Sequence, residues 1–248
     1  MSTATRTRKP SATEEVDEEF PVVLDPSKPM IISAWGRKGS GKSTFNRRIY
    51  DSWPYDKLCI DVNGDADPGP DAERVNTPLP SRFPAPATPT LGARPQGPRN
   101  LHYVADVGSA TYRDDLDRAV GLALFPKDQR TLVWCGEVAE FMPHANSADP
   151  HMRVLLHQNR HYAASVLFDG PRPMNVDPLT IGQSDLIAIY HLPNPKDVQR
   201  LAENMGYPPA RLYDECQETW RRGKYWFLLW DAPAHKIYRC PPLPQDED

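Results

Sequence analysis

The sequence predicts an α/β fold: a three-layer α/β/α sandwich with a mostly parallel sheet, followed by a short C-terminal helical and β-hairpin appendage. Two observations predict it. Short apolar runs alternate with amphipathic helical patterns along most of the chain, an order that arises when right-handed helical crossovers join parallel strands. Near the C-terminus, two apolar runs are separated only by residues 231–234, which is typical of a β-hairpin.

Six short apolar runs have the length and composition of buried strands. They are residues 30–35, 58–62, 101–105, 131–135, 165–169 and 186–191. Helical patterns lie between them or follow them, and Pro and Gly mark several of their ends. They are residues 42–53, 111–125, 150–162, 194–206 and 209–220, and the hairpin is expected from residues 224–230 and 235–240.

Composition sets the domain boundaries. The chain has 248 residues, of which 39% are hydrophobic and 28 are proline, about twice the usual share of proline. Residues 1–20 have the composition of a disordered arm, and 241–248 that of an acidic tail. Residues 21–240 are expected to form one folded domain. Within it, 67–98 form a Pro-rich loop insertion and 207–240 form the C-terminal helix and hairpin.

Several functional classes are excluded by the same composition. No apolar run is long enough to span a bilayer, and the first 20 residues lack the apolar region of a secretory signal. A cytoplasmic protein is therefore expected. Four separated cysteines predict reduced thiols, and neither they nor the histidines have zinc-site spacing. The net charge of −4 argues against a polybasic nucleic-acid binder, so any contact with DNA must be local.

The segment GRKGSGKS matches the phosphate-binding pattern GxxxxGK[ST], and it lies between an apolar strand and a helix. Backbone N–H groups of such a loop surround phosphates, Lys42 reaches the β- and γ-phosphates, and the Ser43 hydroxyl binds Mg²⁺. The motif therefore predicts ATP and Mg²⁺ as cofactors. The expected nucleotide-binding residues are Gly36, Arg37, Lys38, Gly39, Ser40, Gly41, Lys42, Ser43 and Thr44.

A second acidic site is expected at the end of a neighbouring strand, and TLVWCGEVAEF supplies Glu137. Glu137 is the candidate catalytic base that polarises the attacking water. Gly136 stands where an Asp is expected. Three consequences are open: Glu137 also acts as an Mg²⁺ partner, Asp61 helps from another strand, or hydrolysis is weak. The alternative to a catalytic role is an ordinary solvated glutamate.

Beyond the phosphate loop, the chain resembles the FtsK/HerA group of P-loop ATPases, motors that pump double-stranded DNA. LCIDVNGD resembles the second strand of that group. NRHYAASVLFDGPRPMNVDPLTIGQSDLIAIYHLPNPKDVQRLAENMG resembles its block of an Arg-bearing helix end, a sensor strand, an Arg-Pro turn and a Ser-Gln-x-Asp segment. The resemblance implies a P-loop NTPase fold and ATP hydrolysis coupled to DNA translocation.

Residue by residue, the resemblance makes Arg160 the arginine that reaches the γ-phosphate of the neighbouring subunit, with Arg153 in reserve. Asp169 is the nearest substitute for the polar γ-phosphate sensor, because Gly170 and Pro171 stand where Thr-Gln is usual. Gln183 and Asp185 match the Ser-Gln-x-Asp segment, although capping and turn formation explain them equally well.

The short N-terminal region resembles that of viral genome-packaging ATPases, which implies a homo-oligomeric ring of five or six subunits on double-stranded DNA, with a capsid portal as a further partner and no membrane. A conjugation-type DNA-pumping ATPase and a nucleotide-switch assembly protein are alternatives, and a small-molecule kinase is disfavoured. An aromatic cluster near the C-terminus is expected to pack under the hairpin rather than stack on bases. Its members are Trp220, Tyr225, Trp226, Phe227 and Trp230.

Overall fold

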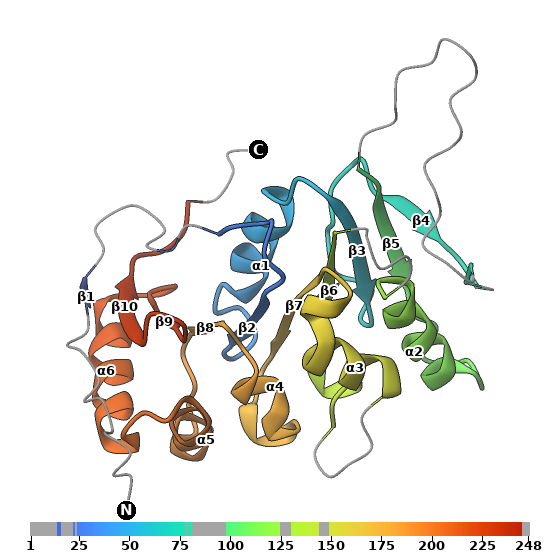
Figure 1. The fold of residues 1–248 in the computed structure, drawn as a ribbon. Coiled ribbons are helices and arrows are strands. Elements are labelled where there is room, and N and C mark those ends of the chain that lie inside the picture. Colours follow the sequence, from blue (N-terminus) through green and yellow to red (C-terminus); the bar gives the residue numbers. More distant parts are fainter. Residues whose placement is uncertain are drawn as a thin grey trace, which may run out of the picture.

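The computed structural model describes residues 14–15, 22, 24–77, 79–80, 98–124, 130–143 and 149–244. Within these residues ten strands form one sheet, in the order β1-β10-β9-β8-β2-β7-β6-β3-β5-β4 (Figure 1). Their bounds are β1 Glu14–Glu15, β2 Ile31–Trp35, β3 Asp56–Asp61, β4 Glu73–Val75, β5 Asn100–Val104, β6 Thr131–Cys135, β7 Ala164–Gly170, β8 Leu186–Ile189, β9 Phe227–Asp231 and β10 Lys236–Cys240. Neighbouring strands are parallel, except that β9 is antiparallel to both β8 and β10.

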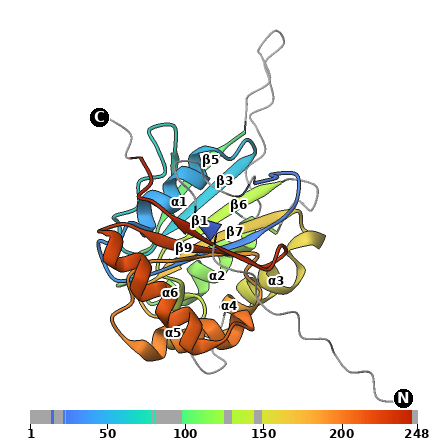
Figure 2. The ribbon, with the colours of Figure 1, turned by 90° about the vertical axis from the view of Figure 1, so that its left-hand side faces the viewer.

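Helices cover both faces of the sheet, as predicted, but unequally. The α-helices are α1 Lys42–Asp51, α2 Tyr112–Leu122, α3 Pro150–Gln158, α4 Pro178–Gly182, α5 Pro195–Met205 and α6 Pro209–Arg222. The chain crosses the sheet one way from β2 to β3 and the other way from β5 through β6 and β7 to β8. Because such crossovers are right-handed, α1 lies on one face and the later helices lie on the other (Figure 2). No α-helix in the described part of the chain is both long and apolar enough to cross a bilayer.

The core is divided by the sheet. Strand β2 shows this most directly, because Ile31 and Trp35 belong to the cluster on the α2–α6 side, whereas Ile32 and Ala34 pack with α1. All five residues of the strand are buried. A strand that is covered on both faces has a continuous run of apolar residues in its sequence. The position of β2 is therefore predictable from the sequence.

The predicted α/β fold class is confirmed, and the predicted run 131–135 coincides with β6. The helix expected over 150–162 is shorter: α3 ends at Gln158, and a 3₁₀ turn, Asn159–His161, leads into β7. The short helix α4 was not distinguished in the sequence, because its five residues are too few to show a periodic pattern.

The C-terminal hairpin continues the main sheet instead of forming the expected appendage. Strand β9 pairs with β8 from Leu186↔Asp231 to Ile189↔Leu228. The Arg239 guanidinium, from β10, donates to Thr219 Oγ1 at 3.0 Å and to Glu215 Oε2 at 2.8 Å. These buried contacts fix α6 against the extended sheet.

Two segments expected to lack regular structure contain short edge strands. Glu14 and Glu15, within the predicted arm, pair with β10, and β4 pairs with β5 inside the Pro-rich stretch. Both strands lie at an edge, where neighbouring prolines are tolerated. The rest of the predicted arm up to residue 20, residues 78 and 81–97, and 245–248 lie outside the described residues.

We expect Glu215→Ala to lower the free energy of unfolding by about 2–3 kcal/mol, because it leaves the Arg239 side chain, which is 5% exposed, without its closest carboxylate. Glu218 contacts the same guanidinium at 3.1 Å, but its side chain is 58% exposed. The matched control Glu218→Ala should therefore cost less than about 1 kcal/mol. Urea unfolding measures both, and equal losses would contradict the role assigned to Glu215.

Candidate functional site

The carboxyl ends of four strands meet at one edge of the sheet. There the glycine-rich loop follows β2, and β7 lies between β2 and β6. The edge therefore brings together segments that are far apart in the sequence: residues 36–43 after β2, Gly136 and Glu137 after β6, Gly170 at the end of β7, and Tyr190 and His191 after β8. Ligand sites of open α/β sheets lie at this edge.

Neighbouring strands hold the start of the glycine-rich loop. Gly36 N–H donates to Gly170 O at 3.3 Å, and Arg37 N–H donates to His191 O at 3.0 Å. A Cβ on Gly36 would lie 2.5 Å from Tyr190 Cβ, so only glycine fits there. Gly41 has φ 107° at the start of α1, a conformation that L side chains rarely adopt.

The Lys42 ammonium, on the first residue of α1, is folded back onto this loop. Its Nζ donates to Gly36 O at 2.7 Å and to Arg37 O at 3.3 Å. Burial lowers the pKa of Lys42, while the neighbouring Asp169 and Glu137 carboxylates act in the opposite direction. Ser43 is exposed at the same helix end, next to Thr44. Loop N–H groups, an ammonium and a hydroxyl at a helix N-terminus suit a phosphate ligand.

Asp169, near the end of β7, lies at the centre of the site. Its Oδ2 accepts a hydrogen bond of 2.5 Å from Asn46 Nδ2. Burial raises the pKa of Asp169, and the Lys42 ammonium and the Glu137 backbone N–H oppose that rise. Asn46 was not among the predicted residues. The signal that identifies it is its spacing, because a residue four positions after Lys42 shares its helix face.

Glu137 follows β6 with φ 56° and ψ 67°, a left-handed conformation that is rare for a residue other than glycine. Burial raises the pKa of Glu137, the Asp169 carboxylate raises it further, and Lys42 opposes them. Strained backbone of this kind is often found at functional sites. The structure thus brings together three predicted residues: Lys42, Glu137 and Asp169.

The carboxylate of Asp61, the alternative acid, is hydrogen-bonded within its own loop. Its Oδ1 accepts N–H bonds from Asn63 and Gly64, and its Oδ2 accepts one from Ala66. The acid from this loop that acts on the site is the exposed Asp65, whose charge raises the pKa of both Glu137 and Asp169. Nothing in the sequence distinguishes Asp65 from the other acids of this loop.

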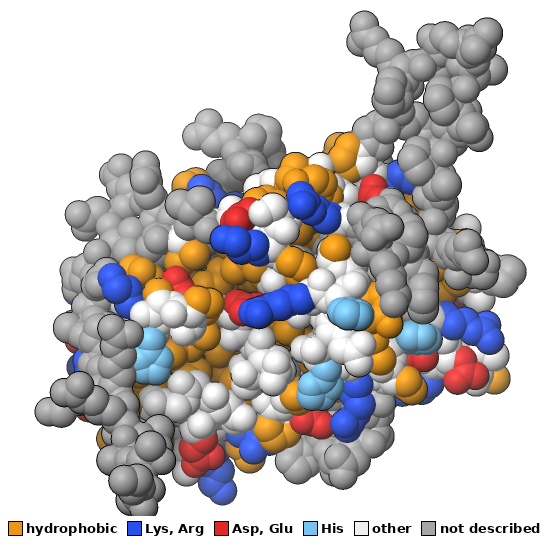
Figure 3. Space-filling view, in the orientation of Figure 1, with side chains coloured by type: hydrophobic (Ala, Val, Ile, Leu, Met, Phe, Trp, Pro, Cys, Tyr) orange, Lys and Arg blue, Asp and Glu red, His pale blue; other side chains and the backbone are white. Residues whose placement is uncertain are grey.

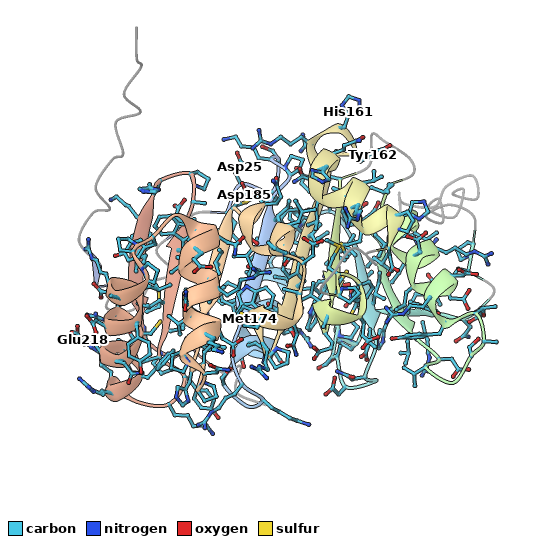
Figure 4. The ribbon with its side chains drawn as sticks, turned by 90° about the horizontal axis from the view of Figure 1, so that it is seen from below. Asp25, His161, Tyr162, Met174, Asp185 and Glu218 are labelled. Atoms are coloured by element: carbon cyan, nitrogen blue, oxygen red, sulfur yellow. The ribbon has the colours of Figure 1, made fainter. Side chains whose placement is uncertain are left out.

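Arg160 lies at the opposite, amino edge of the sheet. Burial raises the pKa of Asp185, and the Ile31 N–H and the Arg160 guanidinium oppose that rise. Asp185 Oδ2 accepts from Ile31 N–H at 2.8 Å, at the start of β2. Figure 4 shows His161 and Tyr162 at the same end of the sheet as Asp185, and Met174 at the other. Arg160 is therefore roughly 16 Å or more from the glycine-rich loop of its own chain, given ~3.3 Å per residue along β2.

The other candidates lie away from the glycine-rich loop in their own chain contacts. Arg153 makes an ion pair with Asp177 at 3.5 Å, and Gln183 is an exposed residue that caps the C-terminal end of α4. In the aromatic cluster, Phe227 and Trp230 are buried in the core as expected, but Trp220, Tyr225 and Trp226 line a cavity beside the glycine-rich loop.

Among the described residues, no group of three or more His, Cys, Asp or Glu is arranged to hold a metal ion. Mg²⁺ makes a different demand, because it retains several waters and takes only one or two protein oxygens together with phosphates. The exposed Ser43 hydroxyl and the Glu137 and Asp169 carboxylates are oxygen donors of that kind. The donor set therefore fits Mg²⁺ that arrives with a nucleotide.

No family model matches the chain, and no curated protein matches it. Several solved structures, however, are similar to the chain. The genome packaging NTPase B204 from Sulfolobus turreted icosahedral virus 2, in complex with ATP-gammaS, is similar with a TM-score of 0.64 and 18% identity over 89% of this chain and 100% of that chain. The DNA-packaging ATPase B204 from Sulfolobus turreted icosahedral virus has a TM-score of 0.59 and 16% identity over 88% and 100%.

The pCW3 conjugation coupling protein TcpA has a TM-score of 0.50 and 15% identity over 89% of this chain and 62% of that chain. These likenesses show that the chain has a P-loop NTPase-like α/β fold, and they confirm the predicted resemblance to viral packaging ATPases at the level of the fold.

We expect Gly36→Ala to lower the free energy of unfolding by about 1–3 kcal/mol, because its Cβ would overlap the Tyr190 side chain. Gly136→Ala is the matched control. Its Cβ would meet nothing within 4 Å, so the change should stay below about 1 kcal/mol. Denaturant unfolding of the two variants tests this, and a cost-free Gly36→Ala would disprove the close approach.

Proposed function

We propose that this protein is an ATP-hydrolysing motor that translocates double-stranded DNA, of the genome-packaging kind, and that it works as a homo-oligomeric ring. The observation that carries the proposal is the convergence of Lys42, Glu137 and Asp169 beside a glycine-rich loop at one sheet edge. The likeness to the genome packaging NTPase B204 over the full length of that chain supports it.

Nucleotide binding is assigned to residues 36–44. In this proposal the Lys42 ammonium exchanges the carbonyls of Gly36 and Arg37 for the β- and γ-phosphate oxygens of ATP. Mg²⁺ bound with the nucleotide would be held by the Ser43 hydroxyl and by Glu137 or Asp169, and it neutralises phosphate charge.

Hydrolysis is assigned to Glu137, which accepts a proton from the attacking water. Its raised pKa makes it a stronger base than an exposed glutamate. Asp169 supplies the second carboxylate. It lies on β7, which pairs with β6, and Gly136 at the end of β6 has no side chain to contribute. Asn46 holds Asp169 in place from α1.

Arg160 is assigned to the active site of a neighbouring subunit. It lies at the end of the sheet opposite its own glycine-rich loop, so it has no role there. An arginine supplied in trans stabilises transition-state charge and makes hydrolysis depend on assembly. This geometry favours a ring over an independently active monomer.

DNA would be gripped through its phosphates by local contacts, without sequence preference. On the face drawn in Figure 3, the Lys and Arg side chains of the described residues are scattered and form no continuous patch. A motor that encloses DNA needs only a few basic groups in its pore, whereas a surface binder needs a basic face. A capsid portal is the protein partner that this reading implies.

A nucleotide-switch assembly protein is the second candidate. The observation that favours it is Gly136, which leaves the end of β6 without the expected acid. A switch of this kind binds ATP and turns it over at a background rate, with no response to DNA. A conjugation-type motor has the same chemistry and differs only in its protein partner.

We expect Lys42→Ala and Glu137→Gln each to lower DNA-stimulated ATP turnover by at least ~100-fold. Glu137→Gln removes the proposed general base, and a positioned general base contributes ~10²–10⁴. Lys42→Ala removes the ammonium proposed to bind the β- and γ-phosphates. Steady-state phosphate release with and without long double-stranded DNA is the measurement. Turnover that is equal in wild type and in Lys42→Ala would contradict the motor, and tight ATP binding without turnover would favour the switch.

We expect an equimolar mixture of Arg160→Ala and Glu137→Gln to recover activity that neither variant has alone. In a mixed ring, the Glu137→Gln subunit supplies Arg160 to a neighbour that retains Glu137. Arg153→Ala is the matched control, because Arg153 pairs with Asp177 in its own chain. If mixing restored nothing while Glu137→Gln still inhibited wild type on co-assembly, Arg160 would not act in trans.

We expect turnover to fall as the pH is lowered through a midpoint above the ordinary range of a glutamate, because Glu137 accepts a proton only when ionised and its pKa is raised. Asp169→Asn removes a negative neighbour, so it should move the midpoint to lower pH. Burial, Lys42, Glu140 and Asp65 still act on Glu137 in that variant. The acid limb of the pH–kcat profile measures the shift, and an unchanged or higher midpoint would refute the coupling.

A further inference from the structure

Exposed cations gather on one side of the glycine-rich loop. Arg37 and Lys38 belong to the loop, and Lys224 lies in the segment between α6 and β9; all three residues are exposed. Arg37 and Lys224 line the same cavity of about 390 Å³. Among the residues that the structure describes, none of the three has a carboxylate partner, and the Lys224 ammonium lies 4.4 Å from the centroid of the Tyr225 ring. We call Arg37, Lys38 and Lys224 the cationic rim.

Positive and negative charges lie on different sides of the loop. The backbone of Arg37 is bonded to His191, which follows β8. Burial lowers the pKa of His191, and the Arg37 guanidinium lowers it further. The carboxylates of Glu137 and Asp169 belong to the ends of β6 and β7, on the other side of β2. An anionic group that approaches from the side of β8 and β9 therefore meets the cations first.

The chain that leaves β10 passes on this same side. Leu243 packs against the core cluster that includes α1, and together with Tyr225 it lines a small hollow at the first turn of that helix. Tyr225 also lines the cavity of Arg37 and Lys224. Leu243 and the cationic rim therefore lie around one aromatic ring. Three of the residues 241–244 are proline, which fixes the backbone φ and stiffens the approach.

An acidic sequence follows directly. The described chain ends at Pro244, and residues 245–248 read QDED. One extended residue spans at most ~3.6 Å, so Asp246 lies within about 11 Å of Leu243 along the chain. Glu247 and Asp248 follow it. The three carboxylates match the three positive charges of the rim in number and in reach.

We propose that residues 245–248 dock on the cationic rim of their own chain and thereby weaken the binding of an anionic nucleotide at the glycine-rich loop. The tail and a triphosphate are both polyanions, so they repel each other and compete for Arg37 and Lys38. Duplex DNA is also a polyanion, but the tail is tethered to a residue that already touches the site. A short tether gives an effective concentration in the millimolar range, which favours the tail as the occupant.

The docking itself does not depend on the proposed function, but its effect on nucleotide binding does. Carbodiimide joins a lysine to a carboxylate that contacts it, and mass spectrometry locates the link. In the full chain at low salt, Lys38 and Lys224 should be linked to residues 246–248. Lys28, which is 79% exposed before β2 at the other edge of the sheet, is the control lysine and should not be. At ~1 M salt the links should disappear, because the Debye length is then ~3 Å.

Isothermal titration of ATP with Mg²⁺ measures the effect on binding. A neutral-tail variant carries Asp246→Asn, Glu247→Gln and Asp248→Asn, and it keeps every described contact. It should lower the Kd for ATP about threefold to tenfold at low salt, the value of a few exposed ion pairs. At ~1 M salt it should bind ATP as wild type does.

Lys224→Gln tests the rim from the other side, since Lys224 is not among the proposed nucleotide-binding residues. With the native tail it should lower the Kd for ATP about twofold, because it weakens docking. In the neutral-tail variant it should cause no decrease, so the two changes are not additive. Lys28→Gln is the matched control and should leave the Kd unchanged with either tail.

Absence of both links, links that form only between isotopically distinct chains, or equal Kd values for wild type and the neutral-tail variant would each overturn the proposal. If duplex DNA protected Lys38 and Lys224 from acetylation equally with either tail, the rim would be assigned to DNA instead. If no form of the chain bound ATP, the proposed function and the inhibitory effect would both fail, while the links would still decide the docking.

Discussion

Strand β2 is flanked on both sides by parallel neighbours, β7 and β8, and this constraint locates the whole site. The loop that leaves β2 emerges between the ends of these strands, so its first N–H groups bind the carbonyls of Gly170 and His191. Tyr190 then fills the space beside Gly36. Neighbouring strands therefore set the path of the loop, and the conformation of the loop in turn sets the position of Lys42.

The charge balance of the site follows from that position. Two carboxylates, Asp169 and Glu137, face the Lys42 ammonium, and burial together with their mutual repulsion raises the pKa of Glu137. One ammonium compensates the charge of one carboxylate, so these three groups carry a net negative charge when all are ionised. Gly136, after β6, has no side chain. Asp169 carries its carboxylate on the adjacent strand β7.

The sequence predicted the fold because its central strands are buried on both faces, and runs such as 131–135 have no polar interruption. It also predicted the meeting of Lys42 with Glu137 and Asp169, since the carboxyl ends of parallel strands share one edge. It did not predict that the Asp61 carboxylate would accept hydrogen bonds from its own loop, or that the charge of Asp65 would raise the pKa of Glu137. Both depend on the conformation of the loop. The cavity beside Tyr225 was missed for a similar reason: strand-spaced aromatic residues give no indication of which of them stay outside the core.

The two ends of β2 carry the two proposed halves of the catalytic machinery. The glycine-rich loop lies at one end, and Arg160 lies near Asp185 at the other, so these two groups lie at opposite ends of the sheet in one chain. The cavity lined by Ser40, Trp220 and Tyr225 lies at the loop end and includes the segment that enters β9. Since β9 and β10 continue the sheet and Arg239 ties β10 to α6, the wall of this cavity is continuous with the C-terminal hairpin. The glycine-rich loop and the outer edge of the sheet are therefore connected within the chain, and the proposed role of Arg160 is one that it would serve in a second subunit.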